Sequence, residues 1–127
     1  MSILEKNGNA FDAAVATGFA LQVVEPHLNG PGGEVPLILC PNGENPIVIC
    51  GQGVAPNSAT LKTFSDMNLN IVPGSGLLPA VVPGAFDAWM LLVLNYWTMS
   101  LRTVLEPAIS IATKGYPLVP NIINTIK

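Results

Sequence analysis

The residues of this sequence that could do chemistry are few, and the most suggestive run is HLNGPGG at 27–33. Glycine-rich turns can present backbone N–H groups to an anion such as phosphate. This run lacks the lysine of a P-loop, and it follows a predicted helix rather than the strand that precedes a dinucleotide-binding motif. The pattern therefore favours a tight turn that needs positive φ angles. A turn that lines a cleft and an anion site are the alternatives.

His27 is the only histidine, so any histidine-dependent catalytic or metal site would have to use it. A histidine just past a helix end commonly caps the helix carbonyls, and we expect that role for His27. Cys40 and Cys50 are ten residues apart and form no CxxC pair, so the sequence predicts no metal site and no other cofactor. We expect both cysteines to be buried free thiols that flank a hairpin loop, with Cys40 facing Ile47.

The carboxylates and serines form no catalytic pattern either. Asp12 and Asp87 fall in the first turns of predicted helices, where the helix dipole favours an anion. No G-x-S-x-G nucleophile elbow occurs, and Gly74-Ser75-Gly76 lacks the required strand–turn–helix setting. The motifs alone therefore predict no catalytic residue in this chain.

Gln52 is the one candidate substrate-binding residue. It is a long polar side chain at the end of a predicted strand, between Gly51 and Gly53. Flanking glycines let the backbone turn sharply and leave room for a ligand. A glutamine can donate and accept hydrogen bonds but cannot form an ion pair. The alternative is a solvent-exposed turn residue without a function.

The elements that must position these residues follow from periodicity and from start and stop signals. The fold class predicted is α/β (α+β), with helices packed on a short antiparallel hairpin whose strands are buried on both faces. The predicted strands are Val35–Cys40 and Ile47–Cys50. The predicted helices are Ser2–Lys6, Ala10–Val24, Ala59–Met67, Gly84–Trp97, Pro107–Lys114 and one that begins at Asn121. A short turn capped by Ser100 is predicted at Leu101–Leu105.

Local residue chemistry sets several of these helix ends. Asn9 and Asp12 resemble a capping box ahead of an apolar helix that should be buried nearly all round. Asn57 or Ser58 should cap the third helix. Pro107 suits the first position of a helix and Gly115 the position after its end.

Composition limits the function. The 127 residues carry 10% charged side chains, against about 25% in ordinary soluble domains. A net charge of −3 with scattered basic residues argues against nucleic acid as a partner. The apolar runs are too short and too polar for membrane insertion. No signal peptide is visible, which slightly favours a cytoplasmic location and leaves the compartment open. We expect residues 1–127 to be a single incomplete domain whose apolar surface is covered by more protein.

An ordered series of segments resembles the γ-glutamyltransferase (γ-glutamyltranspeptidase) family of proenzymes. The series comprises GNAFDAAVA (8–16), VEPH (24–27), GPGG (30–33), VAP (54–56), VPG (82–84), TMSL (98–101), LEPA (105–108) and KGYPL (114–118). The resemblance covers nearly the whole chain. No single motif is decisive, but the order of the series is specific.

The resemblance implies part of an N-terminal-nucleophile hydrolase with an αββα sandwich. Such a proenzyme cleaves itself before a threonine, whose hydroxyl then attacks an amide to form an acyl-enzyme. The chain would correspond to the first part of the large subunit, in the γ-glutamyltransferase-like or acylase-like branch. Its partners would be the remainder of the same proenzyme, which bears the nucleophile, and a small γ-glutamyl or acyl-amide substrate. The isolated chain should be inactive.

Gln52 departs from the glutathione-using form of the family. There, an arginine four residues before the Ala-Pro proline holds the α-carboxylate of the substrate, and counting back from Pro56 gives Gln52. Hydrogen bonds to charged groups contribute roughly 1.5–3 kcal/mol against 0.5–1.5 for neutral ones. The resemblance therefore implies weaker carboxylate recognition and an acyl donor that need not be glutathione.

Two other functions remain open from the sequence. One is a non-catalytic module whose apolar surface binds a protein partner. The other is an anion- or nucleotide-binding domain that uses the HLNGPGG turn.

Overall fold

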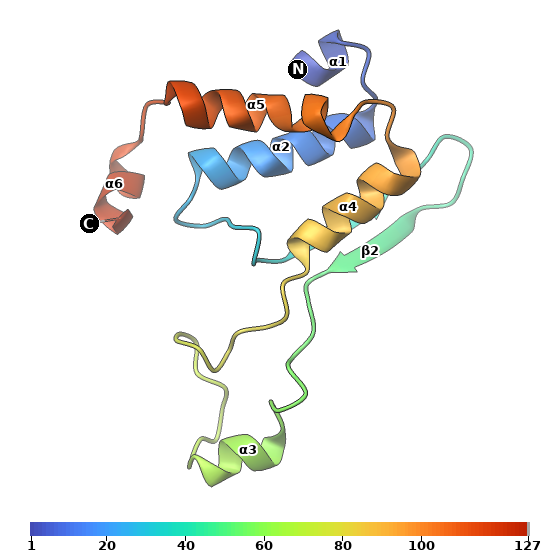
Figure 1. Cartoon of the computed structure of the whole chain (residues 1–127). Coiled ribbons are helices and arrows are strands. Elements are labelled where there is room, and N and C mark those ends of the chain that lie inside the picture. Colours follow the sequence, from blue (N-terminus) through green and yellow to red (C-terminus); the bar gives the residue numbers. More distant parts are fainter. Residues whose placement is uncertain (127) are drawn as a thin grey trace.

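A computed structural model describes residues 1–126, and Lys127, at the end of the helix expected from Asn121, lies outside the described residues. The described part contains one two-stranded antiparallel sheet and a set of helices (Figure 1). In chain order the elements are α1 (Ser2–Glu5), α2 (Ala10–Val24), β1 (Val35–Leu39), β2 (Ile47–Gly51), α3 (Leu61–Asp66), α4 (Ala85–Tyr96), α5 (Leu101–Lys114) and α6 (Pro120–Ile126).

Helix α2 has the bounds that the sequence predicts, and its start is fixed by the predicted capping box. The Asn9 side chain accepts from the Asp12 backbone N–H at 2.9 Å, and the Asp12 carboxylate accepts from the Asn9 N–H at 3.0 Å. The helix is less enclosed than expected, because only Asp12, Val15 and Ala16 are buried. One face packs on α5, which lies beside α2 in Figure 1. Another face of α2, which includes Thr17 and Leu21, is exposed.

Helix α5 runs unbroken from Leu101 to Lys114, so the prediction of a short turn at Leu101–Leu105 and a separate helix that begins at Pro107 is wrong. Proline removes one backbone hydrogen bond of the helix. Val104 and Ala108, on either side of Pro107, are both buried where α5 packs against α2. Burial of that apolar stripe holds the two segments in one helix despite the missing bond.

The hairpin is antiparallel as predicted, but its register and burial differ from expectation. Leu39, not Cys40, lies opposite Ile47, and Cys50 lies opposite Pro36. The strands alternate between partly buried and exposed residues, and Ile38 and Val48 form an exposed cross-strand pair. Helix α4 packs on one face only. The expectation of strands buried on both faces is therefore wrong for the chain as it stands.

The cysteines are free, as predicted, but both are exposed rather than buried. Cys40 lies just beyond β1, and Cys50 belongs to the face of β2 that α4 leaves uncovered. The expected burial fails for the same reason as that of the strands, since no other element covers this face among residues 1–126.

The core lies where α2, α4, α5 and the inner face of the hairpin meet. Trp89 on α4 stacks near Phe19 of α2, with ring centroids 4.9 Å apart. The buried hydrophobic residues that form one cluster are Ile3, Val15, Ala16, Leu39, Ala85, Trp89, Leu92, Val93 and Val104.

Residues 54–82 form an arm that extends away from this core and carries α3 (Figure 1). The Val82 N–H donates to the Val54 carbonyl at 2.9 Å and closes the base of the arm. Helix α3 is shorter than the predicted Ala59–Met67. Its cap is Thr60, whose side chain accepts from the Thr63 N–H, and not Asn57 or Ser58.

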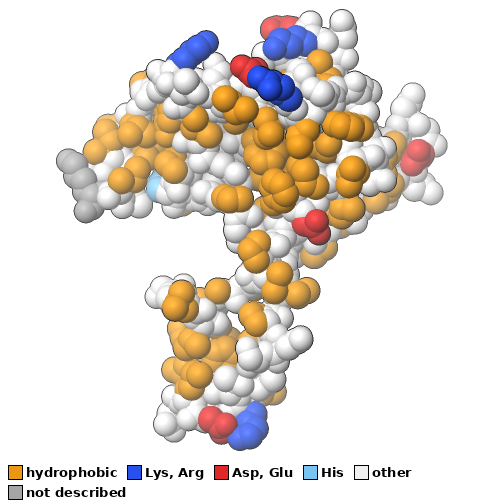
Figure 2. All heavy atoms as spheres, viewed as in Figure 1, with side chains coloured by type: hydrophobic (Ala, Val, Ile, Leu, Met, Phe, Trp, Pro, Cys, Tyr) orange, Lys and Arg blue, Asp and Glu red, His pale blue; other side chains and the backbone are white. Residues whose placement is uncertain are grey.

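Large hydrophobic side chains remain exposed over much of the surface. Figure 2 shows them gathered in the region of α4 and along the arm. Leu61 and Leu77 on the arm are 90% and 92% exposed, and Ile38 on the hairpin is 80% exposed. No helix within residues 1–126 is long and apolar enough to cross a membrane.

Candidate substrate site

Gln52 lies directly after β2 and is exposed, so its side chain is free to meet a ligand. It shares a face of the chain with Cys50, two residues earlier. The Cys50 thiol donates a weak hydrogen bond to Gln52 Oε1, with a sulfur–oxygen distance of 3.5 Å. This contact uses Oε1, and the side-chain NH₂ group of Gln52 donates no hydrogen bond to the described residues.

The glycines around Gln52 are required by close backbone packing. Gly53 has φ +77°, and a Cβ there would clash with the carbonyl of Val82. A Cβ on Gly84 would lie 2.6 Å from the Gly53 nitrogen. The end of β2, the end of the arm and the start of α4 are therefore pressed together at this point, which fixes the backbone on both sides of Gln52.

A small pocket of about 180 Å³ opens between these segments. Gly51 and Gly53, the two neighbours of Gln52, are part of its wall, and Asp87 of α4 supplies the carboxylate. We call it the Gly53 pocket. Its lining residues are Ile49, Cys50, Gly51, Gly53, Val54, Val82, Pro83, Gly84, Asp87, Ala88 and Leu91.

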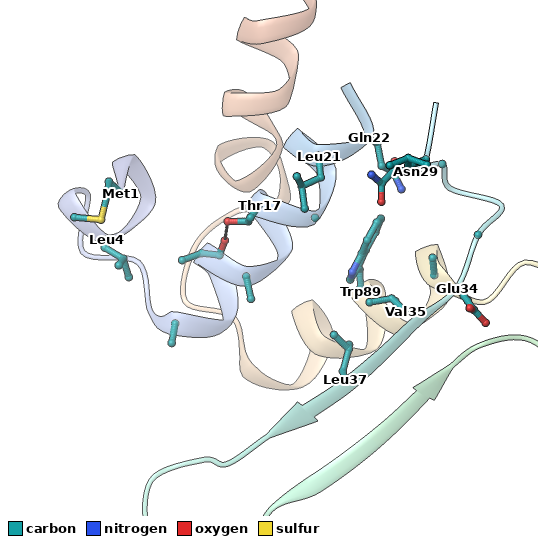
Figure 3. Close-up of a pocket in the computed structure, with 18 residues that line it drawn as sticks. Met1, Leu4, Thr17, Leu21, Gln22, Asn29, Glu34, Val35, Leu37 and Trp89 are labelled. Atoms are coloured by element: carbon teal, nitrogen blue, oxygen red, sulfur yellow. Dashed lines mark hydrogen bonds between the residues drawn. The ribbon is translucent and has the colours of Figure 1, made fainter. Parts of the chain in front are cut away.

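A larger groove of about 810 Å³ runs along the open face of α2 and does not include Gln52 (Figure 3). Leu21 and Thr17 of α2, Leu37 of β1 and Trp89 of α4 are part of its wall. Gln22 lies at one end, and its side-chain nitrogen is buried without a hydrogen-bond partner in the described part of the chain. The wall is mainly apolar and is suited to packing against further protein.

The HLNGPGG run is bonded to the start of α4 through a carbonyl group and not through its N–H groups. Gly33 O accepts from the Gly84 and Ala85 N–H groups, at 3.4 and 3.1 Å, at the start of α4. The Gly33 N–H is itself bonded to Gly30 O at 3.0 Å. The expected positive φ angles are not found here, because the glycines with positive φ are Gly43, Gly53, Gly76 and Gly115. This geometry does not form an anion-binding nest.

His27 and Asp12 have no catalytic geometry. His27 Nδ1 is buried without a partner among residues 1–126, so the expected capping of helix carbonyls is not observed. Asp12 is 1% exposed and is fully used as a structural acceptor. No group of three or more residues that could hold a metal ion occurs in the described part.

The structure thus places the two glycines that flank Gln52, but not Gln52 itself, on the wall of a pocket that the sequence did not predict. Asp87 was assigned only to the first turn of its helix, where it does lie. Its place in the Gly53 pocket depends on packing between segments that are about 35 residues apart, for which the sequence holds no local signal. The Cys50–Gln52 contact, by contrast, follows from the spacing of two residues along extended backbone, which puts both side chains on one face.

Comparison with known proteins defines the class of this chain. Its sequence matches the gamma-glutamyltranspeptidase family over residues 1–127. The chain therefore belongs to the gamma-glutamyltranspeptidase family, as the ordered series of segments predicted.

The relatives that the chain matches include proteins named as glutathione hydrolases and proteins named as acylases. The chain is 36% identical over 123 residues to the glutathione hydrolase-like YwrD proenzyme of Bacillus subtilis, a match that covers 91% of this chain and 22% of the relative. It is 34% identical over 136 residues to the acylase ACY 1 proenzyme of a Pseudomonas species, covering 98% and 24%. The chain thus spans about a fifth of the length of the first curated relatives that it matches.

Solved structures confirm the predicted fold class. The gamma-glutamyltranspeptidase of Helicobacter pylori is 34% identical, with a TM-score of 0.86, over 98% of this chain and 37% of that chain. The cephalosporin acylase of Bacillus halodurans is 37% identical, with a TM-score of 0.88, over 98% and 23%. A protein designated LmbA2991HD is 55% identical, with a TM-score of 0.91, over 95% and 21%. The helices and hairpin therefore form a part of the N-terminal-nucleophile hydrolase fold.

Proposed function

We propose that this chain is one part of a proenzyme that cleaves γ-glutamyl or related acyl amides through an acyl-enzyme. The observation that carries the proposal is the family match across residues 1–127. The names of the relatives, glutathione hydrolases on one side and acylases on the other, support amide substrates as the class.

The reaction that we propose uses a threonine outside this chain. Its hydroxyl oxygen forms a bond to the amide carbonyl carbon, and its own α-amine takes the hydroxyl proton. Backbone N–H groups stabilise the oxyanion that results. The carbon–nitrogen bond then breaks, the leaving amine takes the proton, and water or an acceptor amine releases the acyl group from the threonine.

The share of this chain in that reaction is structural support and substrate binding. In this proposal residues 1–127 are a single incomplete domain, and the rest of the same proenzyme covers the open surfaces. The exposed pair Ile38 and Val48, the apolar groove on α2 and the exposed leucines of the arm all support this arrangement. Exposed apolar surface on this scale is typical of an interface.

Gln52 is the residue that we propose meets the acyl part of the substrate. Its exposure, its position between two glycines with fixed backbone, and an NH₂ group that is not used in a hydrogen bond to the described residues support this role. A neutral amide donor binds a carboxylate less strongly than a guanidinium does. The proposed acyl donors therefore include acyl amides other than glutathione.

The test uses the full-length protein and a matched variant in which the predicted nucleophile threonine is alanine. Hydrolysis of γ-glutamyl 4-nitroanilide and of a neutral acyl 4-nitroanilide is followed by release of the coloured amine. We expect the full-length protein to cleave at least one of these amides and the alanine variant to cleave neither. No cleavage by either protein would reject the proposal in favour of a non-catalytic interaction module. Equal cleavage by both proteins would reject the threonine as the nucleophile.

A further inference from the structure

The turn between the two strands of the hairpin contains an Asn-Gly pair, Asn42-Gly43, that the proposed function does not use. Both residues are exposed. One bond closes the turn, in which the Glu44 N–H donates to the Pro41 carbonyl at 3.0 Å. Gly43 has φ +79°, as the third residue of a type II turn requires. Neither the Asn42 side chain nor the Gly43 N–H donates a hydrogen bond within residues 1–126, so both groups are free to react with each other.

An asparagine that precedes a glycine loses its side-chain amide without an enzyme when the two groups can meet. The glycine nitrogen gives its proton to solvent base and forms a bond to the asparagine Cγ. The Cγ–Nδ2 bond breaks, the leaving group takes a proton from water, and ammonia departs from a five-membered succinimide. Water then opens this ring at either carbonyl and leaves aspartate or isoaspartate. The reaction consumes water, releases ammonia and involves no change of oxidation state.

The backbone at Gly43 has room for the movement that ring closure requires. The peptide plane between Asn42 and Gly43 must rotate until the nitrogen faces Cγ, and glycine permits this because it has no Cβ. Even a Cβ built on Gly43 would meet no atom within 4 Å. The rotation disturbs only the bond that closes the turn, because the paired residues of the two strands begin beyond it, at Leu39 and Ile47.

Contacts restrain the other two Asn-Gly pairs of the chain, Asn7-Gly8 and Asn29-Gly30. The Gly8 N–H donates to the Ile3 carbonyl at 3.0 Å, and a Cβ on Gly8 would lie 2.6 Å from Ile3 Cγ2, so this nitrogen has no space to turn. The Asn29 side-chain NH₂ group donates to the backbone carbonyl and to the carboxylate of Glu25, at 3.4 and 3.3 Å. Ring closure at either pair must first break these contacts.

We propose that Asn42 is a site of spontaneous deamidation, which converts faster in the folded protein than Asn7 and Asn29 do. The product carries a second carboxylate in the turn that holds Glu44. In the isoaspartate form the main chain passes through the former side chain and is longer by one methylene group. The inference does not rest on the proposed function, since Asn42 precedes β2 and Gln52 follows it.

The test follows the full-length protein in a mildly alkaline buffer, because ring closure requires loss of the Gly43 proton. A glutamate-specific protease then separates peptide 35–44, which contains Asn42, from peptide 6–34, which contains Asn7 and Asn29. Mass spectrometry detects conversion as a gain of one mass unit, and fragment ions assign the gain to a residue. The same measurement on protein unfolded in guanidinium gives the rate of each pair without structure.

We expect the three pairs to convert at similar rates in the unfolded protein. On folding, Asn42 should keep nearly its unfolded rate, while Asn7 should slow by roughly tenfold, the factor for one hydrogen bond at the upper end of the usual range. Asn29 should lie between them, because its bonds are exposed. The matched variant is Asn42→Gln, in which peptide 35–44 should keep its mass, since the corresponding six-membered ring forms far more slowly.

Two results would overturn the inference: slowing of Asn42 on folding by as much as Asn7, or a mass gain in peptide 35–44 that persists in Asn42→Gln. The first would show that the turn is restrained in the full-length protein, and the second would assign the modification to another group. Neither result depends on amide cleavage, so the proposed function is tested separately.

Discussion

The Asp12 carboxylate and the Thr98 hydroxyl lie 2.6 Å apart, although 86 residues separate them in the sequence. The same carboxylate accepts from the Thr98 backbone N–H at 3.2 and 3.3 Å and from the Asn9 N–H at 3.0 Å. Asn9 in turn donates from its side chain to the Tyr96 carbonyl at 2.6 Å. One buried carboxylate thus joins the start of α2 to the link between α4 and α5.

This contact predicts a measurable coupling between the two residues. Thr98→Val removes the hydroxyl and keeps the shape, and we expect it to lower the free energy of unfolding by about 1.5–3 kcal/mol, the range for hydrogen bonds to charged groups. Asp12→Asn should cost more, because it removes the charge that accepts from three donors. Urea unfolding of the single and double variants gives the coupling free energy.

Thr17→Val is the matched control for that experiment. Its hydroxyl donates only to the Ala13 carbonyl in the preceding turn of the same helix, and Thr17 is exposed. We expect a change within about 0.5 kcal/mol, as for ordinary surface substitutions. An equal loss for Thr17→Val and Thr98→Val, or additive effects of Asp12→Asn and Thr98→Val, would contradict the proposed coupling.

Gly53 should be much less tolerant of a side chain than Gly76. Both have positive φ, +77° and +88°, but a Cβ on Gly53 meets the Val82 carbonyl whereas a Cβ on Gly76 meets no atom within 4 Å. Gly76→Ala carries only the backbone cost of about 1–2 kcal/mol. Gly53→Ala should lower the free energy of unfolding by clearly more than Gly76→Ala. If urea unfolding gives similar losses for the two variants, the close packing at Gly53 does not contribute to stability.

Gln52→Arg should restore recognition of a substrate carboxylate in the full-length protein. We expect KM for γ-glutamyl 4-nitroanilide to fall about tenfold, since a charge-assisted hydrogen bond exceeds a neutral one by roughly 1.4 kcal/mol. The value of kcat should change little, and KM for a neutral acyl anilide should stay constant. A rise in KM for the γ-glutamyl substrate would place Gln52 away from the carboxylate.

The 127-residue chain by itself should bind hydrophobic dyes and aggregate. Ile38 and Val48, which lie opposite each other on the exposed face of the hairpin, are part of the surface responsible. We expect the double variant Ile38→Thr and Val48→Thr to reduce the fluorescence of an anilinonaphthalene dye and the turbidity of the solution. Loss of secondary structure in circular dichroism would show instead that these residues stabilise the isolated chain.

The sequence predicted best those features that depend on neighbouring residues. The capping box at Asn9 and Asp12, the bounds of α2 and the extent of α4 all follow from chemistry within a few residues. The antiparallel pairing of the two strands follows from the turn residues between them. These local signals needed no knowledge of what the elements pack against.

What the sequence did not predict depends on contacts between distant segments. The unbroken α5 is held by burial of Val104 and Ala108 against α2, which outweighs the local signal of Pro107. The partner of Asp12, the role of the Gly33 carbonyl at the start of α4 and the place of Asp87 in the Gly53 pocket are likewise set by packing. The cysteines and one face of the hairpin are exposed because no other element among residues 1–126 packs on them.

The central claim is that this chain belongs to a proenzyme with an N-terminal threonine nucleophile. The most direct measurement is mass spectrometry and N-terminal sequencing of the purified full-length protein. We predict two pieces, of which the larger contains residues 1–127 and the smaller begins with threonine. Replacement of that threonine by alanine should leave one uncleaved chain. A single intact chain for the unmodified protein, or a second piece that begins with another residue, would contradict the claim.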